Sequence, residues 1–99
     1  MEQHELIERL NALTDDIEHA ASMADWIEAA RVAEARSALV MALTANLSPE
    51  GLATIRRIQA SNDRVFAGAH LAQRELTDEY HAAMGRVQAV SEYHDMARL

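Results

Sequence analysis

The chain has few of the residues that interrupt helices or build strands. Its 99 residues include no Cys, one Pro, three Gly and only four aromatic side chains. Without cysteine it has no disulfide framework, no zinc-finger ligand set and no thiol nucleophile. The scarcity of β-branched, aromatic and turn residues argues against an all-β fold. We therefore expect a single all-α domain over residues 1–99.

Lysine is also missing, so nine arginines oppose sixteen acids and the net charge is −7. A chain this acidic is a poor candidate for binding nucleic acid. Residues 1–50 hold ten acids and three arginines, whereas residues 51–99 hold six of each. An acidic surface on the first half of the chain usually only keeps a protein soluble. Its sharper interpretation is a docking surface for a basic partner. The polar N-terminus and the lack of a run of about 18 apolar residues indicate a cytoplasmic protein without a membrane span.

Alanine dominates the apolar residues. It occupies 20 positions, while Leu, Ile, Val and Phe together occupy 21. Alanine favours helix but buries little area per residue. This composition predicts thin, closely packed helices of modest stability that gain from binding a partner.

Two features divide the chain into helices. Ser48 followed by Pro49 is typical of an N-cap and a first helical position, so one helix ends near Asn46 and another begins at Pro49. A helical apolar stripe runs through the first segment: Leu6, Leu10, Leu13, Ile17, Ala20 and Ala24. Its phase slips by about one residue near residues 22–25, which predicts a turn there although no Gly or Pro enforces it.

The expected fold is an antiparallel bundle of three helices with a long third helix. The helices are predicted at about residues 2–22, 25–46 and 49–84, with a C-terminal extension or short fourth helix at 86–97 after Gly85. The alternative is a long α-hairpin that dimerises, with one helix of about 67 Å over residues 2–46 and another of about 73 Å over 49–97. The phase slip favours three helices, and the lack of a breaker before Pro49 favours the hairpin.

No constellation in the sequence indicates catalysis or a cofactor. Asp16–His19 and Asp78–His81 have the carboxylate-x-x-His spacing of di-iron proteins, but such sites also need glutamates from two other helices. His70 lacks the Lys-Gly that typically follows a phosphotransfer histidine. We expect no metal, no cofactor and no catalytic residue.

Two alternative functions remain. Small all-helical chorismate mutases are the enzymes nearest in length, and they hold a dianionic substrate with Arg and Lys side chains. Here Arg9 and Arg36 lie near apolar stripes but among acids. The other alternative is a structural helical dimer.

Several short motifs resemble one family. Trp26 opens a helix, Arg36 follows ten residues later and a Leu-rich end closes it; Asn62-Asp63-Arg64-Val65 and Arg74-Glu75-Leu76 follow. This pattern resembles the FliT-type flagellar export chaperones, although Met23-Ala24-Asp25 stands where the family usually has a Gly before the Trp. The resemblance implies a small cytoplasmic helical bundle that holds the filament-cap protein, by its C-terminal helical region, before type III export. Some members also contact export ATPase components or a flagellar transcriptional regulator.

A client chaperone needs apolar surface that its own core does not consume. A second apolar row on the helix at 25–46, and apolar side chains beside the stripe of the last helix, supply candidates. The predicted client-binding residues are Val32, Leu39, Leu43, Phe66 and Leu71. We expect Trp26 to cap the bundle end and Arg36 to pair with an acid of the first helix. Asn62 interrupts the last stripe, where it either fixes register with a partner or is partly exposed.

Overall fold

The computed structural model describes residues 1–97, and these residues are helical apart from the N-terminus and two short connections. The three helices, in chain order, are α1 (Gln3–Ser22), α2 (Trp26–Thr44) and α3 (Pro49–Ala97). The predicted all-α class and the three helices are confirmed. The single helix over residues 2–46 is wrong, and with it the long α-hairpin.

Helix α3 continues through Gly85 to Ala97, so the short fourth helix is wrong. One glycine inside a helix costs only about 1 kcal/mol relative to alanine, which is too little to end a helix that has no other breaker. A Cβ atom added at Gly85 would meet nothing within 4 Å, so no packing contact forces a bend there.

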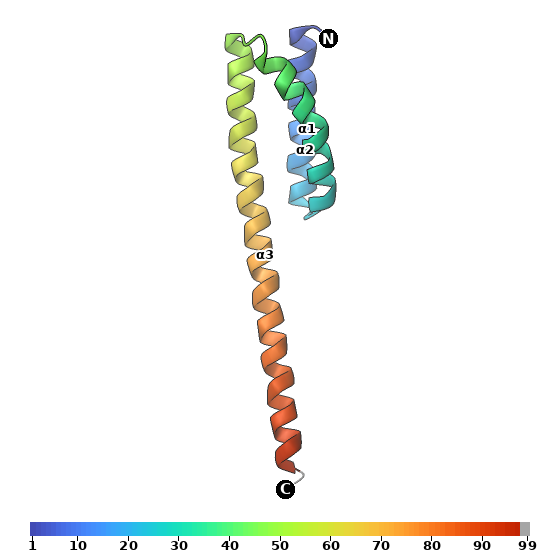
Figure 1. The fold of residues 1–99 in the computed structure, drawn as a ribbon, viewed down its shortest axis with the longest axis vertical. Helices are drawn as coiled ribbons and strands as arrows, with labels where there is room; N and C mark the ends of the chain where they lie inside the picture. The colour runs from blue at the N-terminus through green and yellow to red at the C-terminus, as the bar shows by residue number, and fades with distance from the viewer. Residues whose placement is uncertain (98–99) are drawn as a thin grey trace. The chain divides into compact units, whose positions relative to one another are not determined.

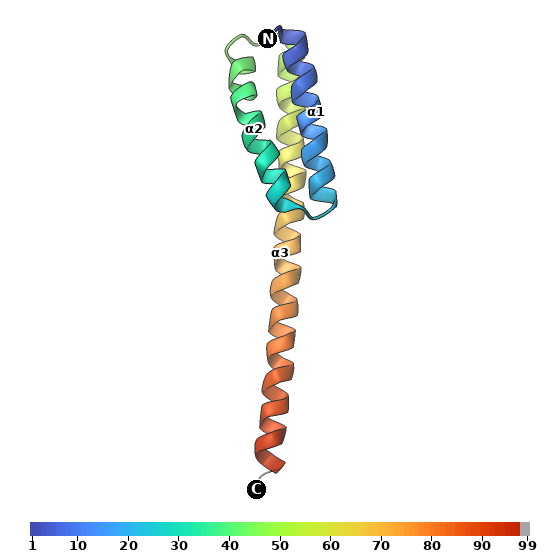
Figure 2. The ribbon, with the colours of Figure 1, turned by 90° about the vertical axis from the view of Figure 1, so that its right-hand side faces the viewer.

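The chain divides into two compact units, residues 1–69 and residues 70–99, and helix α3 contributes to both. In the first unit, α1 and α2 lie side by side and run in opposite directions, with residues 49–69 of α3 alongside them (Figures 1 and 2). The described part of the second unit is a helix over residues 70–97.

The core of the first unit is built on the predicted stripe of α1. Two clusters of buried side chains share it. One consists of Leu13, Ile17, Ala20, Ala29 and Val32, and the other of Leu6, Leu10, Leu43 and Ile58. Leu39 of α2 packs against both clusters. One face of α1 therefore packs against both α2 and the start of α3.

The connection between α2 and α3 is fixed by the predicted cap. The Ser48 hydroxyl accepts a hydrogen bond from the Gly51 N–H (3.0 Å), which confirms Ser48 as the N-cap of α3. The Gln3 side-chain amide donates to the same hydroxyl (2.8 Å) and so ties the start of α1 to this connection. A Cβ atom at Gly51 would lie 3.2 Å from Leu43 Cδ1, so the glycine permits this close approach.

Arginines of α3 form a row of contacts with α1. The Arg57 guanidinium donates to Asn11 Oδ1 (2.6 Å) and to the carboxylate of Asp15, and Arg64 donates to Glu18 Oε1 (2.9 Å). The ion pairs are partly or largely exposed, and such pairs contribute about 0–1 kcal/mol each. They align α3 on α1, while the apolar clusters supply most of the stability.

The turn between α1 and α2 explains the slip in the apolar phase. Helix α1 ends at Ser22, and Ala24 adopts a left-handed conformation with φ 56°. The Asp25 N–H then donates to the Ala20 carbonyl (2.9 Å), and Asp25 Oδ1 accepts from the Glu28 N–H (3.1 Å) to cap α2. The predicted turn is confirmed. Its left-handed residue is an alanine, which carries a steric cost there that glycine does not.

We expect Ala24→Gly to stabilise the protein by about 0.5–1 kcal/mol, because glycine relieves the left-handed strain and loses part of this gain through a freer unfolded chain. Urea unfolding followed by circular dichroism measures the change. Ala38→Gly is the matched control, since Ala38 is exposed within α2. It should destabilise by about 1 kcal/mol. A loss of stability in Ala24→Gly as large as that in the control would contradict the left-handed turn.

Candidate functional site

A groove of about 440 Å³ lies between α2 and the first part of α3, and Ile17 of α1 also lines it. We call it the apolar groove. Its lining residues are Ile17, Trp26, Ala29, Ala30, Ala33, Arg36, Ser37, Asn62, Val65, Phe66 and Ala69. Three alanines form much of the α2 wall, and their single methyl groups leave open the space that larger side chains would fill. The alanine-rich composition therefore contributes to the depth of this groove.

Aromatic side chains line one part of the apolar groove. Phe66 of α3 is 73% exposed, and Trp26, the first residue of α2, is half-buried. A Cβ atom at Gly68 would lie 3.8 Å from the Trp26 ring, so the indole lies against the backbone of α3 there. Trp26 opens α2 as the sequence predicted, and it also forms part of the groove wall.

Arg36 borders the apolar groove and is only 4% exposed. Its Nη1 donates to Thr14 Oγ1 (3.0 Å) and its Nη2 donates to Asn62 Oδ1 (2.6 Å). Thr14 is fully buried and donates in turn to the Leu10 carbonyl (2.8 Å). Burial lowers the pKa of the Arg36 guanidinium from its usual value. One cation thus hydrogen-bonds to both of the other helices of the unit.

The expected pairing of Arg36 with an acid of the first helix is wrong. At this level α1 turns the neutral Thr14 inward, while the acids Asp15 and Glu18 pair with arginines of α3. Asn62 is exposed, and its Oδ1 accepts from Arg36. The interruption that Asn62 makes in the apolar stripe of α3 therefore accommodates the guanidinium.

The five predicted client-binding residues separate in the structure. Val32 and Leu43 are buried at 6% and 1% exposure, and Leu39 is half-buried against the core. The second row of α2 is therefore core rather than open surface, because α2 packs on α1 and α3 at once and the unit has few large apolar residues. Phe66 lines the apolar groove, and Leu71 is exposed in the second unit.

Sequence reasoning missed the alanines of the groove wall. Ala29, Ala30 and Ala33 lie at helical spacing, and small apolar residues at such spacing usually indicate close contact between helices rather than a binding surface. The available signal was that they follow the only tryptophan of the chain within one to two helical turns.

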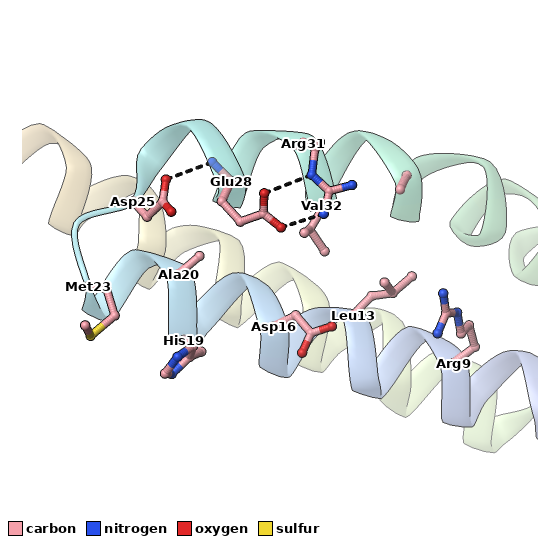
Figure 3. A pocket seen from close by; sticks show the side chains of 11 residues that line it. Arg9, Leu13, Asp16, His19, Ala20, Met23, Asp25, Glu28, Arg31 and Val32 are labelled. Atoms are coloured by element: carbon pink, nitrogen blue, oxygen red, sulfur yellow. Dashed lines mark hydrogen bonds and ion pairs between the residues drawn. The ribbon is translucent and has the colours of Figure 1, made fainter.

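A second hollow of about 560 Å³ lies between α1 and α2 (Figure 3). Arg9, Asp16 and His19 of α1 and Glu28 and Arg31 of α2 line part of it. Glu28 and Arg31 form two hydrogen bonds with each other, which lower the pKa of the Glu28 carboxyl. Within residues 1–97, no group of three His, Cys, Asp or Glu side chains is placed to hold a metal ion. The arrangement is that of a charged, solvated surface.

The second unit carries an apolar row on one face of its helix. Its members, spaced three or four residues apart, are Leu76, Tyr80, Ala83, Val87 and Val90, and we call them the C-terminal stripe. At about 100° per residue they share a face about 80° wide. Its four larger residues are 60–69% exposed. Along residues 1–97 no helix is apolar over a stretch long enough to cross a lipid bilayer.

Comparison of the chain with models of protein families, with curated proteins and with solved structures finds no match.

We expect Leu43→Asp to unfold the first unit, because it places an unpaired carboxylate in a fully buried position at a cost of roughly 4 kcal/mol or more. Leu71→Asp, which adds the same charge at an exposed position, should change stability by less than about 0.5 kcal/mol. Thermal melting followed by circular dichroism compares the two variants. Equal melting temperatures would show that Leu43 lies on the surface.

Proposed function

We propose that the protein is a helix-binding chaperone or adaptor that holds an amphipathic helix of a partner protein in the apolar groove. The observation that carries this proposal is the groove itself, which is open, lined mainly by apolar side chains and flanked by two aromatic rings. Amphipathic helices bind other proteins by laying their apolar face into such a groove. The exposed ring of Phe66 adds apolar surface to the groove that a partner helix can cover.

The partner that we propose is a secreted flagellar subunit, the filament-cap protein, held in the cytoplasm by its C-terminal helical region before type III export. Three residues give the resemblance to FliT-type chaperones its distinctive character: Trp26, Arg36 and Asn62. All three line the apolar groove. Their shared position supports the proposal that the resemblance extends to function. The fold that we propose for this function is an antiparallel three-helix bundle. Export ATPase components or a flagellar regulator are the further partners that the family implies.

The polar groups of the apolar groove favour binding over catalysis. They are the guanidinium of Arg36, the hydroxyl of Ser37 and the amide of Asn62. The lining contains no carboxylate or imidazole to act as a general base. A dianionic substrate of the chorismate mutase kind needs several cations, and this lining offers one. An apolar partner surface suits the groove better.

The only tryptophan of the chain lines the groove and therefore reports its occupancy. We expect a synthetic peptide of the filament-cap C-terminal region to shift the emission of Trp26 to shorter wavelength in a saturable titration, because the peptide excludes water from the indole. Ala30→Arg, which places a long charged side chain in the groove, should weaken binding at least tenfold.

Ala38→Arg is the matched control, since Ala38 is also an exposed alanine of α2 but does not line the groove. It should bind the peptide as the original protein does. Equal affinities of the two variants would place the peptide elsewhere, and absence of binding to the unmodified protein would refute this client.

A structural helical dimer is the second candidate function, and the C-terminal stripe favours it. A single helix cannot bury its own apolar face, so this stripe needs a partner. Glu79 and Arg86 lie on the same edge of the stripe, seven residues or about 10 Å apart. In an antiparallel pair related by a two-fold axis near Ala83, Glu79 of each copy faces Arg86 of the other. A second copy of this chain is therefore the partner that the charges fit.

We expect the protein to sediment as a dimer at micromolar concentration and Arg86→Glu to weaken dimerisation, because two like-charge contacts replace two ion pairs. The double exchange of Glu79→Arg with Arg86→Glu should restore it. Analytical ultracentrifugation measures all three proteins. A monomer at every concentration, or a double exchange no better than the single one, would contradict the antiparallel pair.

A further inference from the structure

Arg36 is a buried cation that meets only neutral oxygens. In the described part of the chain, ion pairs engage the arginines Arg31, Arg57 and Arg64, and none engages Arg36. Its two hydrogen-bond acceptors are a hydroxyl and an amide oxygen. All three ion-paired arginines are more exposed than Arg36, so among these four side chains the one that water screens least is the one whose two acceptors include no carboxylate.

Among residues 1–97, the Arg36 guanidinium has no opposite charge to compensate its burial. Removing a charge from water is costly unless an opposite charge and further hydrogen bonds compensate it. The two neutral acceptors take hydrogen bonds from only two of the N–H groups of the guanidinium, which has five in all. An arginine also stays charged when buried, so it cannot escape the cost by losing its proton.

The Arg36 cation, whose two acceptors are neutral, borders the surface that we propose as the client site. Arg36, Ser37 and Asn62 form the polar part of the apolar groove, and Trp26 lies ten residues before Arg36 on α2. Ten helical residues correspond to about 15 Å, or nearly three turns of a helix laid along α2. A partner in this groove therefore has one place for an anion and, about three turns away, one place for a large apolar side chain.

We propose that the Arg36 guanidinium, held by Asn62, binds a side-chain carboxylate of the partner helix. This inference rests on the proposed function and names the chemistry of its client: an amphipathic helix with one Asp or Glu within its apolar face. The pair gains strength because the carboxylate gives the buried guanidinium an opposite charge and a charge-assisted hydrogen bond in a site shielded from water. A lysine of the partner helix at this position would face the Arg36 cation and be repelled by it, so the site also discriminates against basic helices.

The amide oxygen of Asn62 provides a direct way to supply the missing charge. Asn62→Asp places a carboxylate at the atom that Arg36 already contacts at 2.6 Å. We expect this variant to melt several degrees higher than the original protein and to bind the filament-cap peptide at least tenfold more weakly. Gln59→Glu is the matched control, because it adds the same charge at an exposed position of the same segment outside the groove lining. It should change neither quantity.

The peptide supplies the second half of the test. The filament-cap C-terminal peptide, amidated to remove its terminal carboxylate, is titrated with each Asp or Glu singly changed to Asn or Gln. We expect one replacement to lower the affinity at least tenfold, and the same replacement to have no effect on the Asn62→Asp protein. Equal affinities of all the peptides would overturn the inference while leaving the proposed function intact.

The remaining outcomes are also decisive. If the unmodified peptide does not bind, this client fails, and the melting temperature of Asn62→Asp still tests the state of Arg36. An unchanged or lower melting temperature would show that Arg36 does not lack a charge, which overturns the inference. A higher melting temperature together with no discrimination between acid and amide peptides would make Arg36 a structural residue only.

Discussion

The buried guanidinium of Arg36 makes the hydrogen bonds that join all three helices of the first unit at one point. It reaches from α2 to Thr14 of α1 and to Asn62 of α3, and so fixes the three helices at one level between the two apolar clusters. Few side chains other than arginine can contact two neighbours at such a separation while burying an aliphatic stem. This contact leaves a cation away from water without a carboxylate, at the position where we propose that the groove recognises an acidic side chain.

Alanine shapes the rest of that surface. Large apolar residues are scarce, and the core of the first unit takes up those of α1 together with Val32, Leu43 and Ile58. Alanines on α2 then leave a depression between the helices, and the aromatic rings of Trp26 and Phe66 lie along it. The same composition that makes the core thin also makes a groove, because a methyl group fills less space than the helices leave between them.

The charges divide between two roles. Acids on the outer face of α1 engage Arg57 and Arg64 and align α3, while the second unit carries Glu79 and Arg86 beside an apolar stripe. The first set acts within the chain, and the second is the set that we propose for self-association. The two proposed binding surfaces lie in different units, so client binding and self-association rest on separate residues.

The sequence by itself determined the helical class, the cap at Ser48, the turn before Trp26 and the stripe of α1, because each depends on residues close together in the chain. It also brought out Trp26, Arg36 and Asn62 as distinctive. Only the tertiary structure decided that Val32 and Leu43 are core, that Arg36 faces Thr14 rather than an acid, and that the three distinctive residues share one groove. Helical periodicity shows which residues share a face, but the neighbours of that face depend on how α1, α2 and α3 pack, which local patterns do not encode.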